Sequence, residues 1–509
     1  MADEVLNELG RAARGGAIAL VGMVISAVFG FLVRTAIGRY FGPKEYGTYS
    51  LAMTVFTVTL VIVMLGFPMG IQRQVSYFLN TRKGETPKLV FTGLTLVAIT
   101  SLVGLLTLEA IKGSLPRYIG GGTLFTEMLK ILAFALPLNA LFNVAIAITQ
   151  GFGRVREFLF YGKIGVPITY FTLTILLIFL TRNITYVPLS FFSTYLIMLA
   201  ILLLDLAKNN ILPRKFAFSW QLAKLLTLFS IPLMASNLVA FIMTWTDTLM
   251  LGHFFGDKIV GIYNAAGPIT RFIPVFLASF TVIYTSIATG LYAKGEVEKV
   301  KKFYAIITKW IVLLTFPLFI LIVGYPIPVL RVFFGEQYVS AWKPMVILAM
   351  GFMFHSIVGP NGLTLVTIGK PSEDMKGNII GATLNILLNY LLIPTYGMVG
   401  AATATAVSYV ATNLYKIAVL ASQGINPFER RYLKVLLICI SMTTPTLLLR
   451  TDSIAWAVTY TLVISVIFYV LVLLNGSFEK EDIELLKLAG KRFGLKIGFL
   501  TRLIEKFSN

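Results

Sequence analysis

The chain has 509 residues, of which 57% are hydrophobic and only 13% are charged, and its mean hydropathy is +0.83. Because soluble domains carry about 25% charged residues, these values exclude an ordinary soluble protein and indicate a membrane protein. The net charge of +20 would point to nucleic acid in a soluble protein. In a membrane protein, an excess of lysine and arginine is explained first by the orientation of the helices in the bilayer, so we expect no nucleic-acid partner. The lone cysteine, Cys439, excludes an internal disulfide, and we expect no metal and no cofactor.

The sequence predicts an all-α integral membrane protein with about 14 transmembrane helices, since about 20 apolar residues cross a bilayer. The predicted spans are residues 16–37, 46–70, 89–111, 126–150, 163–181, 187–207, 225–251, 259–290, 308–330, 344–368, 377–394, 398–420, 435–450 and 453–474. Most of the 43 lysines and arginines fall in alternate connecting segments. The positive-inside rule then predicts that both termini are cytoplasmic, in a multi-pass protein of the plasma membrane.

One segment of the chain occurs twice. Residues 38–52 read GRYFGPKEYGTYSLA, and residues 252–266, 214 positions later, read GHFFGDKIVGIYNAA. The identical pairs are Gly38/Gly252, Phe41/Phe255, Gly42/Gly256, Lys44/Lys258, Gly47/Gly261, Tyr49/Tyr263 and Ala52/Ala266. Each copy is a polar turn between two apolar segments, so the repeated unit is a pair of membrane helices with its loop. Such internal repeats are typical of membrane transporters.

The repeat divides the chain into two lobes. The expected parts are an N-lobe of spans 1–6 (residues 15–207), a linker (208–224), a C-lobe of spans 7–12 (225–421) and spans 13–14 (422–474). Since six is even, both lobes enter the membrane in the same orientation and form two parallel six-helix repeats. The linker is polar, basic and contains proline, as is typical of a boundary.

Charged segments flank the spans at both ends of the chain. Residues 1–14 predict a short cytoplasmic amphipathic segment. Residues 475–509 predict a basic amphipathic cytoplasmic tail, and the apolar spacing from Ile483 to Phe507 fits a helix that lies on the anionic membrane surface. The alternative for this tail is a solvated extension that only carries positive-inside charge.

An ionisable group inside a membrane span is costly and therefore indicates function, and three such residues stand out. They are Arg34 in span 1, Asp247 in span 7 and Arg271 in span 8. Arg271 lies roughly 16 Å into its span, and the flanking Pro268 and Pro274 predict an opened helix that lines a cavity. The alternative is a structural arginine whose hydrogen bonds are satisfied by the carbonyls that the prolines free.

Arg34 and Asp247 are the second candidate site. Arg34 lies roughly 6 Å from the outer end of its predicted span, so its side chain could instead reach the interface. Under the 214-residue shift Arg34 corresponds to Thr248, which predicts that Arg34 and Asp247 lie at similar depth on related helices. We therefore predict that the two charges form an outer gate, which pairs when the outer side closes.

Weaker signals favour packing over chemistry. The pairs Asn139/Asn143 and Asn385/Asn389 are spaced to lie on one helix face and most often hold helices together, although ligand contact is the alternative. His355 has no acidic neighbour, so a packing histidine is favoured over a proton relay. The sequence has no phosphate-binding loop, HExxH or clustered carboxylates, and we expect a transporter and not an enzyme.

The chain resembles the polysaccharide-export branch of the multidrug, oligosaccharidyl-lipid and polysaccharide exporter superfamily over about residues 15–474. The resemblance depends on three segments: GRYFGPKEYGTYSLA, Gly66-Phe67-Pro68 followed by IQRQVS, and NILLNYLLIPTYGMVGAATAT at residues 385–405. It implies two six-helix bundles in a V around a central cleft, plus two C-terminal helices. The implied activity is alternating-access flipping of a polyprenyl-pyrophosphate oligosaccharide from the cytoplasmic to the outer leaflet, for surface polysaccharide or glycan assembly.

The predicted spans also resemble those of the lipid II flippases, in which spans 13 and 14 form a groove for the lipid tail. Those flippases carry cavity arginines on spans 1 and 8, and Arg34 and Arg271 match them by span. Arginine binds pyrophosphate through bidentate hydrogen bonds, so both residues are candidate substrate ligands. We expect a monomer in the lipid bilayer and leave a coupling ion unassigned.

Two rival functions stay open. A multidrug cation antiporter of the same superfamily should have carboxylates in its N-lobe cavity, whereas span 1 here offers Arg34. A membrane glycosyltransferase or ligase that uses the same lipid donor needs catalytic residues in a sizeable outer loop, and the predicted outer loops are short.

Overall fold

The computed structural model describes residues 2–212, 217–449, 451–479 and 481–483, and this part of the chain is helical throughout, with no strand. The α-helices are α1 Ala2–Phe41, α2 Pro43–Met64, α3 Phe67–Thr81, α4 Thr86–Ile111, α5 Pro116–Ile119, α6 Gly122–Gly151, α7 Val155–Glu157, α8 Val166–Thr181, α9 Val187–Lys208, α10 Trp220–Phe255, α11 Asp257–Thr270, α12 Val275–Ala293, α13 Val297–Gly324, α14 Pro326–Phe333, α15 Trp342–Ile357, α16 Asn361–Thr367, α17 Pro371–Ser422, α18 Arg430–Leu448 and α19 Ile454–Leu474. Short 3₁₀-helices are η1 Lys83–Glu85, η3 Ile184–Tyr186 and η4 Glu336–Ala341, and a π-helix, η2, covers Phe158–Gly165.

The all-α multi-pass architecture is confirmed. Among the described residues ten helices are long and apolar enough to cross a membrane, or eleven if α11 and α12 count as one bent span. The division into fourteen spans stays a prediction. Large apolar side chains are exposed on α18 and α19, for example Leu437 at 66% and Val466 at 62%, as expected for helices that face lipid.

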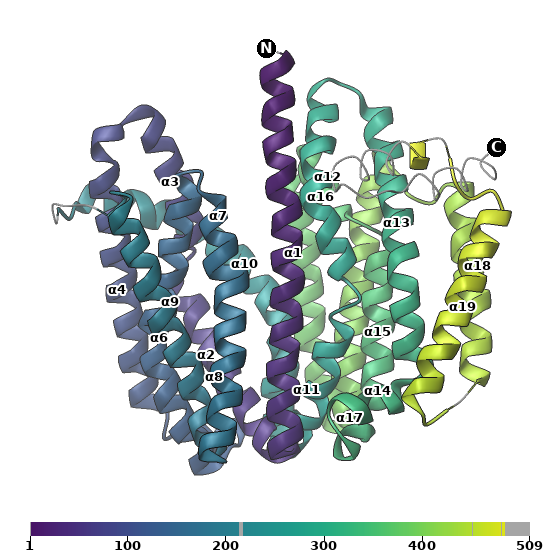
Figure 1. Ribbon diagram of the computed structural model, residues 1–509, viewed down its shortest axis with the longest axis horizontal. Helices are drawn as coiled ribbons and strands as arrows, with labels where there is room; N and C mark the ends of the chain where they lie inside the picture. Colours follow the sequence, from purple (N-terminus) through teal and green to yellow (C-terminus); the bar gives the residue numbers. More distant parts are fainter. Residues whose placement is uncertain (1, 213–216, 450, 480, 484–509) are drawn as a thin grey trace. The chain divides into compact units, whose positions relative to one another are not determined.

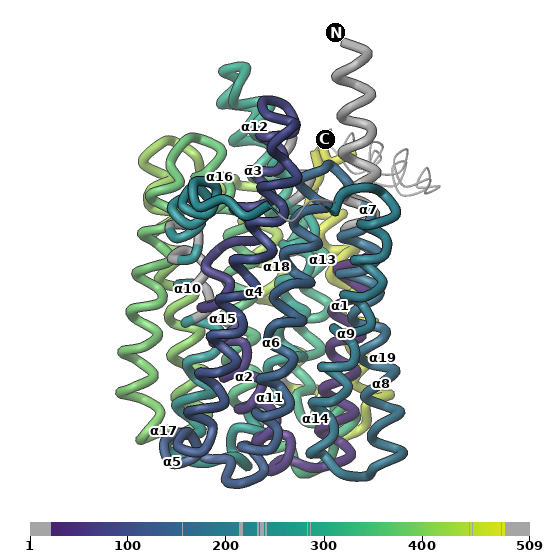
Figure 2. The backbone as a smooth tube through the Cα atoms, turned by 90° about the vertical axis from the view of Figure 1, so that its left-hand side faces the viewer, coloured from purple at the N-terminus to yellow at the C-terminus, as the bar shows by residue number. Residues whose placement is uncertain are grey.

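Several helices extend beyond the predicted spans. Span 1 ends at Phe41 in the structure, and span 2 continues as α3 to Thr81, past a break at Leu65 and Gly66. Figure 2 shows α3 continuing the course of α2. Hydropathy marks only the apolar core of a membrane helix, whereas the hydrogen-bonded helix continues into the polar interface, and this explains the difference.

The chain forms two compact units. One is Val21–Ala265, and the other combines Met1–Leu20 with Ala266–Asn509. In the first unit α6 packs against α2, α3, α4 and α9, and Figure 1 shows α4, α6 and α9 side by side. In the second unit α15 packs against α13 and α17.

Helix α10 joins the unit that contains α2, α3 and α4 because it packs directly on these helices. Two glycines allow the close approach: a Cβ on Gly66 would lie 2.4 Å from the Ser230 carbonyl oxygen, and a Cβ on Gly70 would lie 2.1 Å from Ser230 Oγ. The Gly66-Phe67-Pro68 motif therefore has a packing role. The two lobes inferred from the repeat stay a prediction, since the contact-based units divide the chain at a different point.

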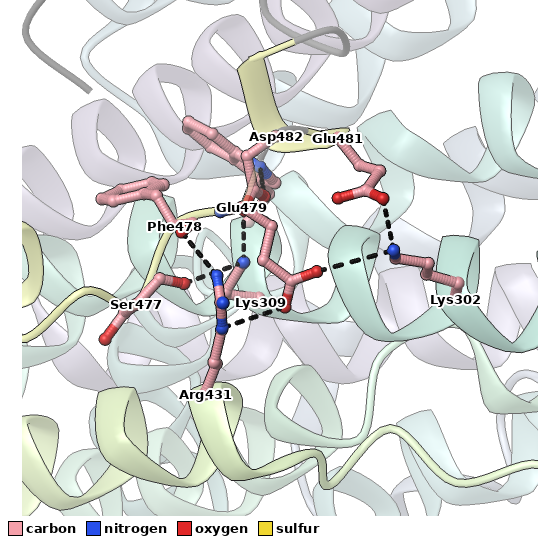
Figure 3. Close-up of polar contacts among 9 residues, drawn as sticks. Lys302, Lys309, Arg431, Ser477, Phe478, Glu479, Glu481 and Asp482 are labelled. Atoms are coloured by element: carbon pink, nitrogen blue, oxygen red, sulfur yellow. Dashed lines mark hydrogen bonds and ion pairs between the residues drawn. The ribbon is translucent and has the colours of Figure 1, made fainter. Parts of the chain in front are cut away.

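The segment after α19 is anchored to α13 by a buried ion pair (Figure 3). Lys309 Nζ lies 2.5 Å from Asp482 Oδ2 and donates to the Ser477 carbonyl at 3.1 Å. Asp482 is fully buried and also accepts from Trp310 Nε1 at 2.8 Å and from the Glu479 amide at 2.7 Å. The carboxylate therefore has a donor on α13 for each oxygen, which fixes the start of the C-terminal tail.

Two further contacts surround this anchor. Arg431 at the start of α18 donates to the Phe478 carbonyl at 2.8 Å, and Lys302 forms an ion pair with Glu481 (Figure 3). The predicted amphipathic helix of the tail, from residue 484 onward, lies outside the described residues, and so do the side chains of residues 1–14.

Candidate functional site

Arg34 lies on α1 beside a pair of tyrosines in the first unit. It is half-buried and lies seven residues, roughly 10 Å, before the end of α1 at Phe41. It is therefore deeper in its helix than the predicted span implied. Its charge acts on the phenols of Tyr49 and Tyr170, whose hydroxyls are hydrogen-bonded to each other.

Aromatic rings surround these tyrosines. Phe191 packs against Tyr170 with ring centres 5.5 Å apart, against Phe56 at 5.2 Å and against Tyr195 at 4.8 Å. An arginine close to such an apolar, water-poor cluster would bind an anion more strongly than an arginine in water, because the local dielectric is low.

Asp247 lies on α10 and is 5% exposed. It accepts a 2.5 Å hydrogen bond from Tyr263 on α11, and its neighbour Thr248 donates to Asn264 Oδ1 at 3.3 Å. Asp247 lies eight residues before the end of α10 at Phe255, roughly 12 Å, so its depth from the helix end is close to that of Arg34. The pairing of Arg34 with Asp247 in a gate stays a prediction.

The two copies of the repeated turn contact each other. A Cβ on Gly47 would lie 1.8 Å from the Asp257 carbonyl oxygen, and a Cβ on Gly261 would lie 1.8 Å from the Pro43 carbonyl oxygen. Since Asp257 and Gly261 are the equivalents of Pro43 and Gly47, the contact is symmetrical. The first turns of α2 and α11 thus touch through their backbones, which explains why both copies have glycine here.

Arg271 lies at the break between α11 and α12. Residues 271–274 form a turn, and the two helices are bent by 48° across it. Pro268 lies inside α11 and Pro274 directly precedes α12, so the predicted opening of the helix around Arg271 is confirmed. Arg271 is half-buried.

The second unit contains a buried polar network that the sequence analysis missed. Lys416 Nζ lies 2.6 Å from Asp374 Oδ1 and donates to Asn378 Oδ1 at 2.8 Å. The only hint in the sequence is a lysine within the apolar stretch of span 12. Its side chain is 9% exposed and belongs to this ion pair.

Two amide side chains and one histidine lie next to this network. Asn413 Oδ1 accepts from Asn361 at 2.8 Å and lies 3.1 Å from His355 Nδ1. The packing interpretation of His355 agrees with this contact. Helix α17 is kinked at Gly397, which separates Asn385 and Asn389 from Thr405. Asn389 donates to Asn385 at 3.1 Å and Asn385 donates to Thr405 at 3.1 Å, so these amides connect the two halves of α17.

The candidate residues thus form separate groups. Arg34 and Asp247 belong to the first compact unit, and Arg271 belongs to the second. Across the described residues no group of three or more histidine, cysteine, aspartate or glutamate side chains could hold a metal ion. The polar groups of the candidate sites are the two arginines, Asp247, the tyrosines and the buried polar network.

Comparisons with known proteins agree with this fold. The family model described as "Polysaccharide biosynthesis protein" matches residues 12–284, and the MatE family model matches residues 232–391. An uncharacterized membrane protein of Methanocaldococcus jannaschii is 22% identical over 86% of this chain and 90% of its own length. The probable low-salt glycan biosynthesis flippase Agl15 of Haloferax volcanii is 22% identical over 79% of this chain and 82% of its own length.

Among solved structures, the lipid II flippase MurJ in an inward closed conformation shares the fold. It superposes with a TM-score of 0.74 at 17% identity and covers 89% of this chain and 97% of its own. The first family model spans more than half of the 509 residues. The chain therefore belongs to the polysaccharide biosynthesis protein family of membrane transporters.

Proposed function

We propose that this protein flips a polyprenyl-pyrophosphate-linked oligosaccharide from the cytoplasmic to the outer leaflet of the plasma membrane by alternating access. The observation that carries the proposal is Arg271, a cation placed at the break of a membrane helix. A pyrophosphate that enters the membrane needs a fixed cationic partner, and the planar guanidinium offers it two parallel hydrogen bonds. The names of the flippase relatives support the same class of cargo.

Arg34 is the second proposed ligand of the pyrophosphate. Its position beside Tyr49 and Tyr170 supplies hydroxyl groups as well as charge. Hydroxyl donors and a cation together suit a phosphate oxygen better than they suit a cationic drug. This favours the flippase over the antiporter.

The orientation belongs to the same proposal. With both termini in the cytoplasm, most of the 43 basic residues lie on the cytoplasmic side. The repeated turns then lie on the outer side, where Arg34 and Asp247 would form the gate. The protein is proposed to work as a monomer, since each chain carries both halves of the repeat.

A reconstituted flipping assay tests the proposal. Purified protein in liposomes should move a fluorescent polyprenyl-pyrophosphate saccharide between leaflets, and Arg271→Ala should slow this movement by about a hundredfold, the effect of two charge-assisted hydrogen bonds. Arg271→Lys should recover only part of the rate, because lysine keeps the charge and loses the bidentate geometry. Arg331→Ala removes an exposed arginine that pairs with Glu336 and serves as the control.

Two results would contradict the proposal. Equal flipping by the native protein and Arg271→Ala would remove this residue from the mechanism. If the native protein moved no lipid but exchanged an organic cation for protons or sodium, the antiporter function would replace the flippase.

A further inference from the structure

A pocket of about 370 Å³ lies in the second unit next to the Arg271 break. One wall is the first part of α12, including Leu277 and Ala278, and the other wall is the buried polar network of Lys416 and Asp374. Its volume falls at the lower end of the range of small-molecule sites, roughly 300–1,000 Å³. Pro274, which directly precedes α12 and lines the pocket, follows Arg271 by three residues.

The polar wall of the pocket is held in place before any ligand arrives. Asn361 is 2% exposed and is fixed by Asn413 at 2.8 Å, while its own Oδ1 accepts from the Gly362 amide at 2.7 Å. A Cβ on Gly362 would lie 2.4 Å from Asp374 Oδ1 and 3.2 Å from Lys416 Nζ, so the backbone of α16 lies directly against the ion pair. Fixed polar groups lose little entropy on binding, which favours recognition.

The chemistry of the two walls defines the class of ligand. Asp374 and Asn361 offer acceptor oxygens, and Lys416 and the ring of His355 offer donors. The ion pair is neutral as a whole, so the wall does not favour a ligand of either charge. A sugar ring has hydroxyl groups that both donate and accept on its rim and C–H groups on its face, which match the polar wall and the apolar side of α12.

We propose that this pocket binds the sugar residue next to the pyrophosphate of the lipid-linked substrate. The inference rests on the proposed function, since Arg271 would hold the pyrophosphate beside it. The first sugar is bonded directly to the pyrophosphate, and Pro274, three residues after Arg271, already lines the pocket. In the proposed orientation α12 runs from mid-membrane toward the cytoplasm, where the glycan would enter the protein.

Binding measurements on the full-length protein in detergent test this assignment. The probes are a fluorescent polyprenyl pyrophosphate without sugar and the same lipid linked to one glucose, one N-acetylglucosamine or one glucuronate. For the native protein we expect at least one uncharged sugar to tighten binding by about tenfold to a hundredfold, the effect of one or two hydrogen bonds to fixed charged groups. Glucuronate should gain less, because its carboxylate loses hydration in the pocket and the neutral ion pair offers no net attraction that compensates for this loss.

Two variants alter the pocket in different ways. Ala278→Phe fills it from the exposed side of α12 without touching the polar network. Asp374→Asn combined with Lys416→Met removes both charges together and leaves neither one buried alone. In each variant the sugar should no longer tighten binding of the lipid, while the affinity for the lipid without sugar should stay unchanged. Ile287→Phe lies two and a half turns along α12 from Ala278, on the opposite face of the helix, and should change neither affinity.

The outcomes separate this inference from the proposed function. If the native protein binds all four lipids equally and Arg271→Ala weakens them all, the flippase site stands and the sugar pocket is wrong. If both pocket variants keep the full preference for a sugar, the pocket is also wrong. If the native protein binds none of the four lipids, the proposed function fails and the inference fails with it.

Discussion

Replacing Asp482 with asparagine should release the C-terminal segment from α13. The change leaves the charge of Lys309 buried without a counter-ion, because the two side chains are only 0% and 4% exposed. Breaking a buried ion pair by removing one partner costs about 3–5 kcal/mol. At about 1.4 kcal/mol for each factor of ten, the population of opened segment should rise roughly a hundredfold to a few thousandfold.

A cysteine reporter measures this opening. Ser477 is fully buried beside the ion pair, so Ser477→Cys in a Cys439→Ser background places the one thiol of the chain under the anchored segment. When the segment recloses faster than a water-soluble maleimide reacts, the labelling rate is proportional to the opened population. We expect Asp482→Asn to raise this rate by the factor given above.

Lys302→Ala is the matched control. It removes an ion pair to the same segment, but the side chains of Lys302 and Glu481 are 45% and 40% exposed. Exposed pairs contribute about 0–1 kcal/mol, so labelling should rise no more than about fivefold. If the two variants label at the same rate, or if Asp482→Asn labels like the native protein, burial does not determine the strength of this anchor and the reasoning is refuted.

Two further predictions concern the repeated turns and the charges near them. Gly47→Ala or Gly261→Ala should lower the melting temperature and slow flipping, because the added methyl group forces the two backbones apart at a cost of about 1–3 kcal/mol or more. Gly267→Ala is the control, since its methyl group meets no atom within 4 Å and should be tolerated. Equal melting temperatures for all three variants would disprove this prediction. Reversing the charge of Arg34 or of Asp247 alone should slow flipping. Reversing both charges should raise the flipping rate roughly tenfold above that of the single variants. A double variant no faster than the slower single variant would rule out the gate.

Local sequence patterns predicted those features that arise within one helix. Apolar length located the membrane helices, and two prolines located the break at Arg271, because both effects act on neighbouring residues. The Lys416 pair was missed since Asp374 lies 42 residues away in sequence, and a single sequence carries no sign of such a contact. The ion pairs of the acidic residues after α19 were likewise not predicted, because the sequence shows this tail only as basic overall. Their partners are Lys302 and Lys309 on α13, far earlier in the chain.

The symmetrical contact of Gly47 and Gly261 bears on the origin of the protein. When equivalent surfaces of two copies touch reciprocally, the arrangement is that of a two-fold homodimer. A contact in which Gly47 touches Asp257 while Gly261 touches Pro43 has this form within one chain. An ancestral protein of half the length would have associated through the same glycine, and gene fusion would have joined its two subunits. Glycine would then have been retained in both copies because neither could change without separating the pair.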